Sequence, residues 1–257
     1  MSDGTELRVL RTKADKKSRN GYTLFLIPGW NSAVPSWDIL LMEAIHYFDT
    51  IYFESREKFS SKLNWKTKNT LDRISEDVAE VVHHFKLDEE KLVMLASSWG
   101  DIFLADALAK KKINPHVTFL TGVTAKLTLP KGTRHIIPFI TPFTLNMLKP
   151  LLRWWLINKK SENEEQAQKN LRNLEESDPR KWKKVVKYST GYQWDTYAKI
   201  EQNIVIAGAE KDKMHSFTES QKIVNLIKNV TYIDMESNKN VHSKNMITEL
   251  RKHLESM

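Results

Sequence analysis

The stretch KLVMLASSWGDIFLADALAK, residues 91–110, decides how the rest of the chain is interpreted. Its first part, Leu92 to Ala96, is a short apolar run typical of a buried strand, and its last part has the apolar spacing of a helix. The motif Ala96-x-Ser98-x-Gly100 lies between them and predicts a tight turn with Ser98 at its tip. Small residues on both sides of the serine let strand and helix approach closely. An ordinary strand-to-helix loop has the same composition, so the rest of the chain is needed to distinguish the two.

The composition describes a globular chain without cysteine chemistry. Its 257 residues fit one α/β domain with an insertion, and 40% apolar with 28% charged residues is ordinary for such a domain. There is no cysteine, which excludes disulfides, thiolate metal sites and a thiol nucleophile. The histidines show no metal-ligand spacing. We therefore expect neither a metal nor another cofactor.

The net charge of +8 raises the question of a nucleic-acid partner. The basic residues are spread over Arg11 to Arg19, Lys110 to Lys112 and Arg180 to Lys187, and no nucleic-acid-binding module accompanies them. We interpret them as solvated surface, so no nucleic-acid partner is expected.

Two features bear on location. The N-terminus is polar and has no apolar signal region, which favours a cytoplasmic protein by default. The most apolar stretch, Ile136 to Ile157, contains three prolines together with Lys149 and Arg153, so stable membrane insertion is not expected. The oligomeric state stays undetermined.

Apolar runs alternate with amphipathic segments along most of the chain. Besides residues 92–96, the expected strands are 22–27, 50–53, 116–120, 203–207 and 230–235, with an edge strand at 6–10. Strands alternating with helices indicate parallel strand-helix-strand units. The predicted fold class is α/β, with a mostly parallel central sheet covered by helices on both faces.

Residues 121–199 interrupt this alternation. The segment separates two expected strands, is too long for a simple crossover and is rich in Pro, Trp and Lys. We interpret residues 1–120 and 200–257 as the core, and 121–199 as a mainly helical cap. Open α/β sheets bind ligands at the edge that this cap would cover.

Two further residues follow strands in the way that Ser98 does. Asp212 comes after strand 203–207, and His242 after strand 230–235. A serine nucleophile needs a base and an orienting acid. Ser, Asp, His is one of the chain orders in which such a catalytic triad is found. Taken alone, Asp212 also fits a turn residue, His242 a surface residue, and His215 is a rival base.

These motifs together resemble the α/β-hydrolase superfamily, from about residue 22 to the C-terminus. The segment LFLIPGWNSAVPSW is similar to the family's oxyanion strand, Glu54-Ser55-Arg56 lies where the family often has Asp-x-Arg, and AEKDKMHS is similar to the segment carrying the acid. Pro28 stands where the family usually has His, and Ala96 replaces the first Gly of the serine turn.

The resemblance implies a role for each site residue. Ser98 would attack a carbonyl carbon, His242 would take and return the proton, and Asp212 would orient the imidazole. The backbone N–H groups of Trp30 and Trp99 would bind the oxyanion, and losing one such donor costs ~3–4 kcal/mol.

Asp101 departs from the family pattern, which has a small residue there. A carboxylate near a helix N-terminus is electrostatically favoured, so one interpretation is a helix cap. The other is a carboxylate directed into the pocket.

The cap segment also predicts a pocket wall. Phe139, Phe143, Met147 and Trp154 form a broad apolar surface that could line the pocket, although much of it must also pack on the sheet edge. We therefore expect a carboxylic ester with a hydrophobic moiety, hydrolysed through an acyl-enzyme.

Other functions stay open at this point. The turn SSWGD is also similar to that of proline iminopeptidases, but IPGWNS lacks their His-Gly-Gly-Pro-Gly segment. A thioesterase, an acyltransferase or a carbon–carbon hydrolase would use the same three residues. A non-catalytic relative that retains the pocket as a ligand-binding site is the remaining alternative.

Overall fold

The central feature is a seven-stranded sheet with strand order β1-β3-β2-β4-β5-β6-β7. In this computed structural model, which describes residues 1–126, 139–161, 163–187, 191, 193–210 and 215–257, only β1 runs antiparallel to its neighbour. The strands are β1 (Val9–Thr12), β2 (Thr23–Ile27), β3 (Asp49–Phe53), β4 (Leu92–Ser97), β5 (Val117–Thr121), β6 (Ile204–Gly208) and β7 (Val230–Asp234). The predicted α/β class and mostly parallel sheet are confirmed.

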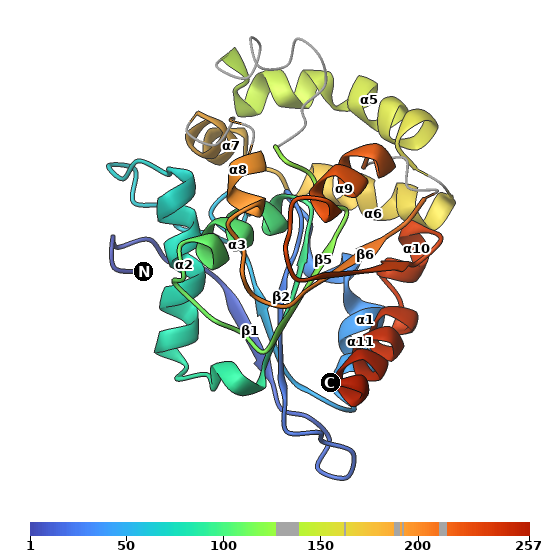
Figure 1. Cartoon of the computed structure of the whole chain (residues 1–257). Coiled ribbons are helices and arrows are strands. Elements are labelled where there is room, and N and C mark those ends of the chain that lie inside the picture. Colours follow the sequence, from blue (N-terminus) through green and yellow to red (C-terminus); the bar gives the residue numbers. More distant parts are fainter. Residues whose placement is uncertain (127–138, 162, 188–190, 192, 211–214) are drawn as a thin grey trace.

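Helices cover both faces of this sheet (Figure 1). They are α1 (Asp38–Ala44), α2 (Leu71–His84), α3 (Trp99–Ala109), α5 (Pro142–Lys159), α6 (Glu164–Glu175), α7 (Pro179–Val186), α8 (Trp194–Tyr197), α9 (Phe217–Val224), α10 (Asn238–Val241) and α11 (Lys244–Ser256), with 3₁₀ turns at Val34–Ser36 and Glu89–Lys91. α1 and α11 pack on one face, and α2, α3, α8 and α9 on the other.

Strand β2 shows why its sequence is apolar throughout. Phe25 and Ile27 belong to the core beneath α2 and α3, whereas Leu24 and Leu26 belong to the core beneath α1 and α11. All four side chains are completely buried. A strand covered on both faces needs a continuous apolar run, and each such side chain contributes roughly 1.5–3 kcal/mol on burial.

The predicted strands are observed with shifts of a residue or so at their ends, except at the N-terminal edge. There the expected strand 6–10 is displaced to Val9–Thr12, and Glu6 forms only an isolated bridge with Lys62. An edge strand is only partly buried, so its apolar pattern is weaker and its ends are harder to predict from the sequence.

Helices α5, α6 and α7 come from the predicted cap and lie together beyond one end of the sheet (Figure 1). A capping box of Thr141 and Thr144 starts α5, and the Asn163 side chain caps α6. A small core of Ile140, Leu145 and Val186 joins α5 to α7 and contacts Trp30. α8 instead packs against α3 on the sheet.

The loop after β3 is held by a buried ion network around Arg56. Its Nε and Nη2 atoms donate to the Asp77 carboxylate at 2.6 and 2.7 Å, and Nη1 donates to Asp3 at 2.7 Å and to Asn69 at 2.9 Å. Burial opposes the charge, but the hydrogen bonds and charges of Asp77 and Asp3 outweigh it and raise the pKa of Arg56. The network fixes this loop to α2 and to the N-terminal segment.

Candidate active site

Ser98 lies at the junction of β4 and α3 with an unusual backbone. Its φ is 54° and its ψ is −111°, a conformation that few residues other than glycine adopt. The strand ends at Ser97 and the helix starts at Trp99, so the serine alone makes the sharp turn. Its side chain is half-buried and therefore accessible, in the geometry expected of a nucleophile on a strand-to-helix turn.

Two glycines allow this turn to form. A Cβ atom on Gly100 would lie 2.7 Å from the carbonyl oxygen of Ile27, so only glycine lets α3 start this close to β2. A Cβ on Gly29 would lie 3.3 Å from the Cβ of Ser98. The loop after β2 therefore passes directly beside the serine.

The predicted oxyanion donors, the backbone N–H groups of Trp30 and Trp99, flank this position. Trp30 follows Gly29, and Trp99 is the first residue of α3, where a helix leaves its N–H groups without internal partners. Among the described residues, neither N–H donates a hydrogen bond. Both remain available for an anionic oxygen near Ser98.

A cleft of about 340 Å³ opens over the serine. Ser98, Trp30, His215 and His242 all line it. Thus the structure brings the predicted nucleophile and the predicted base to one cleft, together with the rival base. Asp212 lies outside the described residues.

The ring of His242 is held from two sides. Its Nδ1 atom lies 2.9 Å from the carbonyl oxygen of Asn238, and its ring centroid lies 4.3 Å from that of Trp37. A carbonyl oxygen can only accept a hydrogen bond, so Nδ1 carries the proton in this contact. In the neutral ring, Nε2 is then the basic nitrogen.

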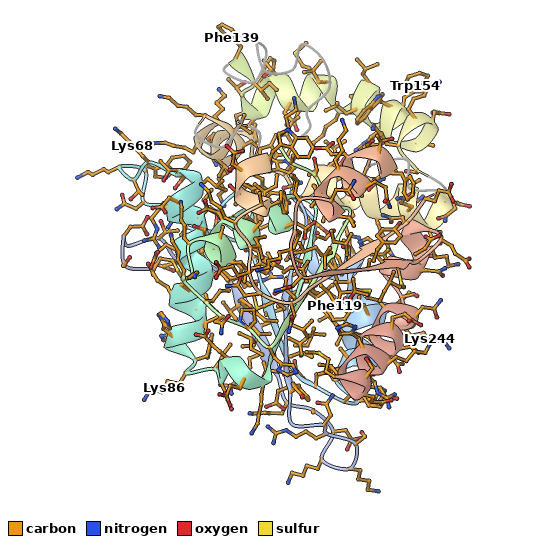
Figure 2. All side chains as sticks on the ribbon, in the orientation of Figure 1. Lys68, Lys86, Phe119, Phe139, Trp154 and Lys244 are labelled. Atoms are coloured by element: carbon orange, nitrogen blue, oxygen red, sulfur yellow. The ribbon has the colours of Figure 1, made fainter. Side chains whose placement is uncertain are left out.

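The cleft wall contributed by the inserted helices differs from the prediction. It comes from α6 and is polar: Asn163, Glu165, Gln166, Lys169, Asn170 and Asn173. Phe139, Phe143, Met147 and Trp154 do not line the cleft, and their side chains are 76%, 73%, 69% and 55% exposed. Figure 2 shows Phe139 and Trp154 at the outer surface of the molecule. Their apolar character alone did not indicate which way α5 would face.

Asn173 is a site residue that the sequence did not reveal. Its Oδ1 accepts hydrogen bonds from the backbone N–H of Ala33 at 3.0 Å and from the Ser36 hydroxyl at 3.3 Å. The Asn31 side chain donates to the backbone carbonyl of Asn173. Asn173 thus joins α6 to the loop that carries Trp30. An asparagine on a polar helix gives no sequence signal for such a role.

Asp101 is completely buried and does not line the cleft. Within the described part of the chain, neither carboxylate oxygen has a partner at hydrogen-bond geometry. Burial raises the pKa of Asp101 well above its usual value, and the nearby backbone of Ser98 and Thr121, too poorly aligned for full hydrogen bonds, offsets only part of this effect. Of the two interpretations, the pocket-facing carboxylate is not what the structure shows.

The buried carboxyl predicts a pH-dependent effect of Asp101→Asn. Because the folded-state pKa exceeds the unfolded one, this group destabilises the fold as pH rises through the interval between them. We expect the neutral amide to raise the unfolding midpoint by several degrees at pH 8 and to lose this advantage near pH 4. Circular dichroism melting curves across this range measure it.

Asp49 provides a control of opposite sign. Burial acts to raise the pKa of Asp49. The hydrogen bonds from the N–H of Ala14 and the ammonium group of Lys13 have a larger, opposite effect, so the pKa is lowered overall. Asp49→Asn should therefore destabilise the fold at pH 8. A difference between Asp101→Asn and wild type that is independent of pH would contradict the prediction.

The described residues were also inspected for metal and membrane features. No three His, Asp or Glu side chains in this part of the chain gather as a metal ion would require. None of the described helices combines the length and the apolar character needed to span a bilayer.

Comparison with known proteins identifies the fold. No family model matches the sequence, and no curated protein matches it. The structure is similar to an enol-lactonase from Burkholderia xenovorans (TM-score 0.76, 11% identity, 98% of this chain and 96% of that one). It is also similar to an esterase from Exiguobacterium antarcticum (0.74, 15%, 97% and 97%) and to an α/β hydrolase from Sphaerobacter thermophilus (0.72, 13%, 97% and 96%). The chain therefore has the α/β-hydrolase fold.

Proposed function

We propose that the protein is a serine hydrolase that cleaves carboxylic esters through an acyl-enzyme. The observation that carries the proposal is the backbone of Ser98, held at φ 54° beside the two N–H groups that no described residue engages. Such strain persists where surrounding structure enforces it and is common at active sites. The esterase and the enol-lactonase among the similar structures support this type of reaction.

The reaction would proceed in two halves. The Ser98 hydroxyl attacks the ester carbonyl carbon while Nε2 of His242 takes its proton, and the oxyanion forms beside the N–H groups of Trp30 and Trp99. The tetrahedral intermediate collapses, and His242 gives the proton to the leaving alcohol. Water then attacks the acyl carbon while His242 takes its proton, the bond to the Ser98 oxygen breaks, and His242 returns the proton to the serine as the carboxylic acid leaves. In this proposal Asp212 keeps the role that the family resemblance implies, orienting His242.

The cleft also bears on the substrate. The hydrophobic moiety expected from residues 139–154 has no support, because those side chains lie outside the cleft. The amide and charged side chains of α6 instead favour an acyl or alcohol group that can form hydrogen bonds. A volume of about 340 Å³ suits a small ester, near the lower end of ligand pockets.

A fluorophosphonate probe tests the proposal. We expect it to label the wild-type protein at the peptide containing Ser98 and to fail on Ser98→Ala. Ser97→Ala is the matched control, because Ser97 is adjacent but only 6% exposed. Labelling that persists in Ser98→Ala would overturn the catalytic assignment.

A substrate panel separates the alternatives that share this site. Turnover of p-nitrophenyl acetate without turnover of prolyl p-nitroanilide favours an esterase over a proline iminopeptidase. Faster turnover of acyl thioesters would indicate a thioesterase, and ester formation with an added alcohol would indicate an acyltransferase. Ligand binding without labelling or turnover would indicate a non-catalytic relative.

A further inference from the structure

Glu57 and Lys58 form a buried ion pair in the loop after β3. The Lys58 Nζ atom lies 3.2 Å from Oε1 of Glu57, and the two side chains are 4% and 0% exposed. Buried ion pairs rarely repay their desolvation unless further hydrogen bonds satisfy both groups. The remaining contacts of this pair are therefore informative.

The Lys58 ammonium group donates to the backbone carbonyl of Gly29. That carbonyl belongs to the same planar amide as the N–H of Trp30, the predicted oxyanion donor. In a trans amide the C=O and N–H bonds point in opposite directions, so a group that holds the oxygen also fixes where the N–H points. The only other donor to this oxygen among the described residues is the N–H of Ser32, at 3.1 Å.

Glu57 contacts the second oxyanion residue. Its Oε2 atom accepts a hydrogen bond from the indole N–H of Trp99 at 3.2 Å, and its Oε1 accepts one from the Ser55 hydroxyl at 2.8 Å. The carboxylate thus anchors the residue that begins α3, while its ion pair holds Lys58 against Gly29. One pair of adjacent side chains contacts both halves of the proposed oxyanion hole.

The loop that carries this pair is itself fixed from α7. Lys181 donates to the backbone carbonyls of Lys58, Phe59 and Ser61 at 2.9, 2.6 and 2.5 Å. Lys181 therefore constrains the backbone of the loop but makes no contact with the Gly29 carbonyl. Removing Lys181 should therefore affect only the stability of the loop, whereas removing Lys58 should also affect the oxyanion amide.

We infer that Lys58, held by Glu57, is a positioning residue that orients and polarises the Gly29–Trp30 amide for oxyanion binding. The inference rests on the proposed function. A cationic donor on the carbonyl withdraws electron density from the amide and makes its N–H a stronger donor. The benefit is largest when the N–H faces a full negative charge, so it acts on the transition state more than on the bound ester.

Lys58→Met tests this inference, because it retains a side chain of similar length without the ammonium group. We expect kcat for p-nitrophenyl acetate to fall about 10–100-fold with KM within about 3-fold of wild type. Loss of an entire oxyanion donor costs ~10²–10³-fold, so weakening one donor should cost less. The inhibition constant of a trifluoromethyl ketone, whose serine adduct carries an oxyanion, should rise by the same factor as kcat falls.

Lys181→Met is the matched control, since it removes a buried lysine that contacts the same loop from α7 but does not touch the oxyanion amide. We expect it to lower the unfolding midpoint and leave the inhibition constant within about 3-fold. If Lys58→Met does not fold, Lys58→Gln and the neutral double variant Glu57→Gln/Lys58→Met provide the same comparison. Folded variants with wild-type kcat and a wild-type inhibition constant would overturn the inference. A wild-type protein without labelling or turnover would instead overturn the proposed function itself.

Discussion

The His242→Ala variant is expected to hydrolyse p-nitrophenyl acetate with kcat lowered about 10⁵–10⁶-fold. The Ser98 hydroxyl is a weak nucleophile until a base takes its proton, and Nε2 is the nitrogen that the Asn238 contact leaves basic. Residues that act as one unit are not additive, so Ser98→Ala and the double variant Ser98→Ala/His242→Ala should lose about the same activity as His242→Ala. Steady-state rates at high enzyme concentration measure all three.

His215 provides the control, since it lines the same cleft and is the rival base. We expect His215→Ala to retain kcat within about 10-fold of wild type. The reverse pattern, in which His215→Ala is inactive and His242→Ala is active, would transfer the role of base to His215. Equal residual activity in both variants would contradict a single histidine base.

The second large effect concerns stability. Arg56→Met should lower the free energy of unfolding by ~3 kcal/mol, the lower end for a broken buried pair, because the fully buried Asp77 carboxylate loses its bidentate partner and, among the described residues, keeps only the contact with Arg73. The same change also removes the hydrogen bonds to Asp3 and Asn69. Chemical denaturation with urea measures this loss directly.

Arg153 offers a comparison of the same side-chain type. Its ion pair with Glu175 spans 2.6 Å, but the two side chains are 52% and 41% exposed. Exposed pairs contribute ~0–1 kcal/mol, so Arg153→Gln should change the stability only slightly. Similar losses in the two variants would mean that the buried network contributes no more than a surface pair.

The sequence predicted the sheet because burial leaves a strong pattern. Strands such as β2 and β4 are covered on both faces, and their continuous apolar runs could be located almost to the residue. The serine turn was equally recognisable, since Gly100 allows a close approach that no other residue can make. These features depend on local sequence and on burial.

The rest of the site depends on contacts between distant segments. The outward face of α5 was predicted as a pocket wall, because exposed and pocket-lining apolar residues have the same composition. Lys58 and Asn173 gave no signal, since a charged loop residue and a polar helix residue are usually solvated. Their partners, the Gly29 carbonyl and the backbone of Ala33, are identified only once the fold brings them together.

The hydrogen bonds of Asn173 have a consequence for access to the cleft. The Asn173 side chain and the Asn173 backbone carbonyl join the loop that carries Trp30 to helix α6, which lines the cleft. A displacement of α6 would therefore also release that loop. The position of the Trp30 N–H therefore depends on where α6 sits, so widening the cleft on the α6 side would also disturb the proposed oxyanion site.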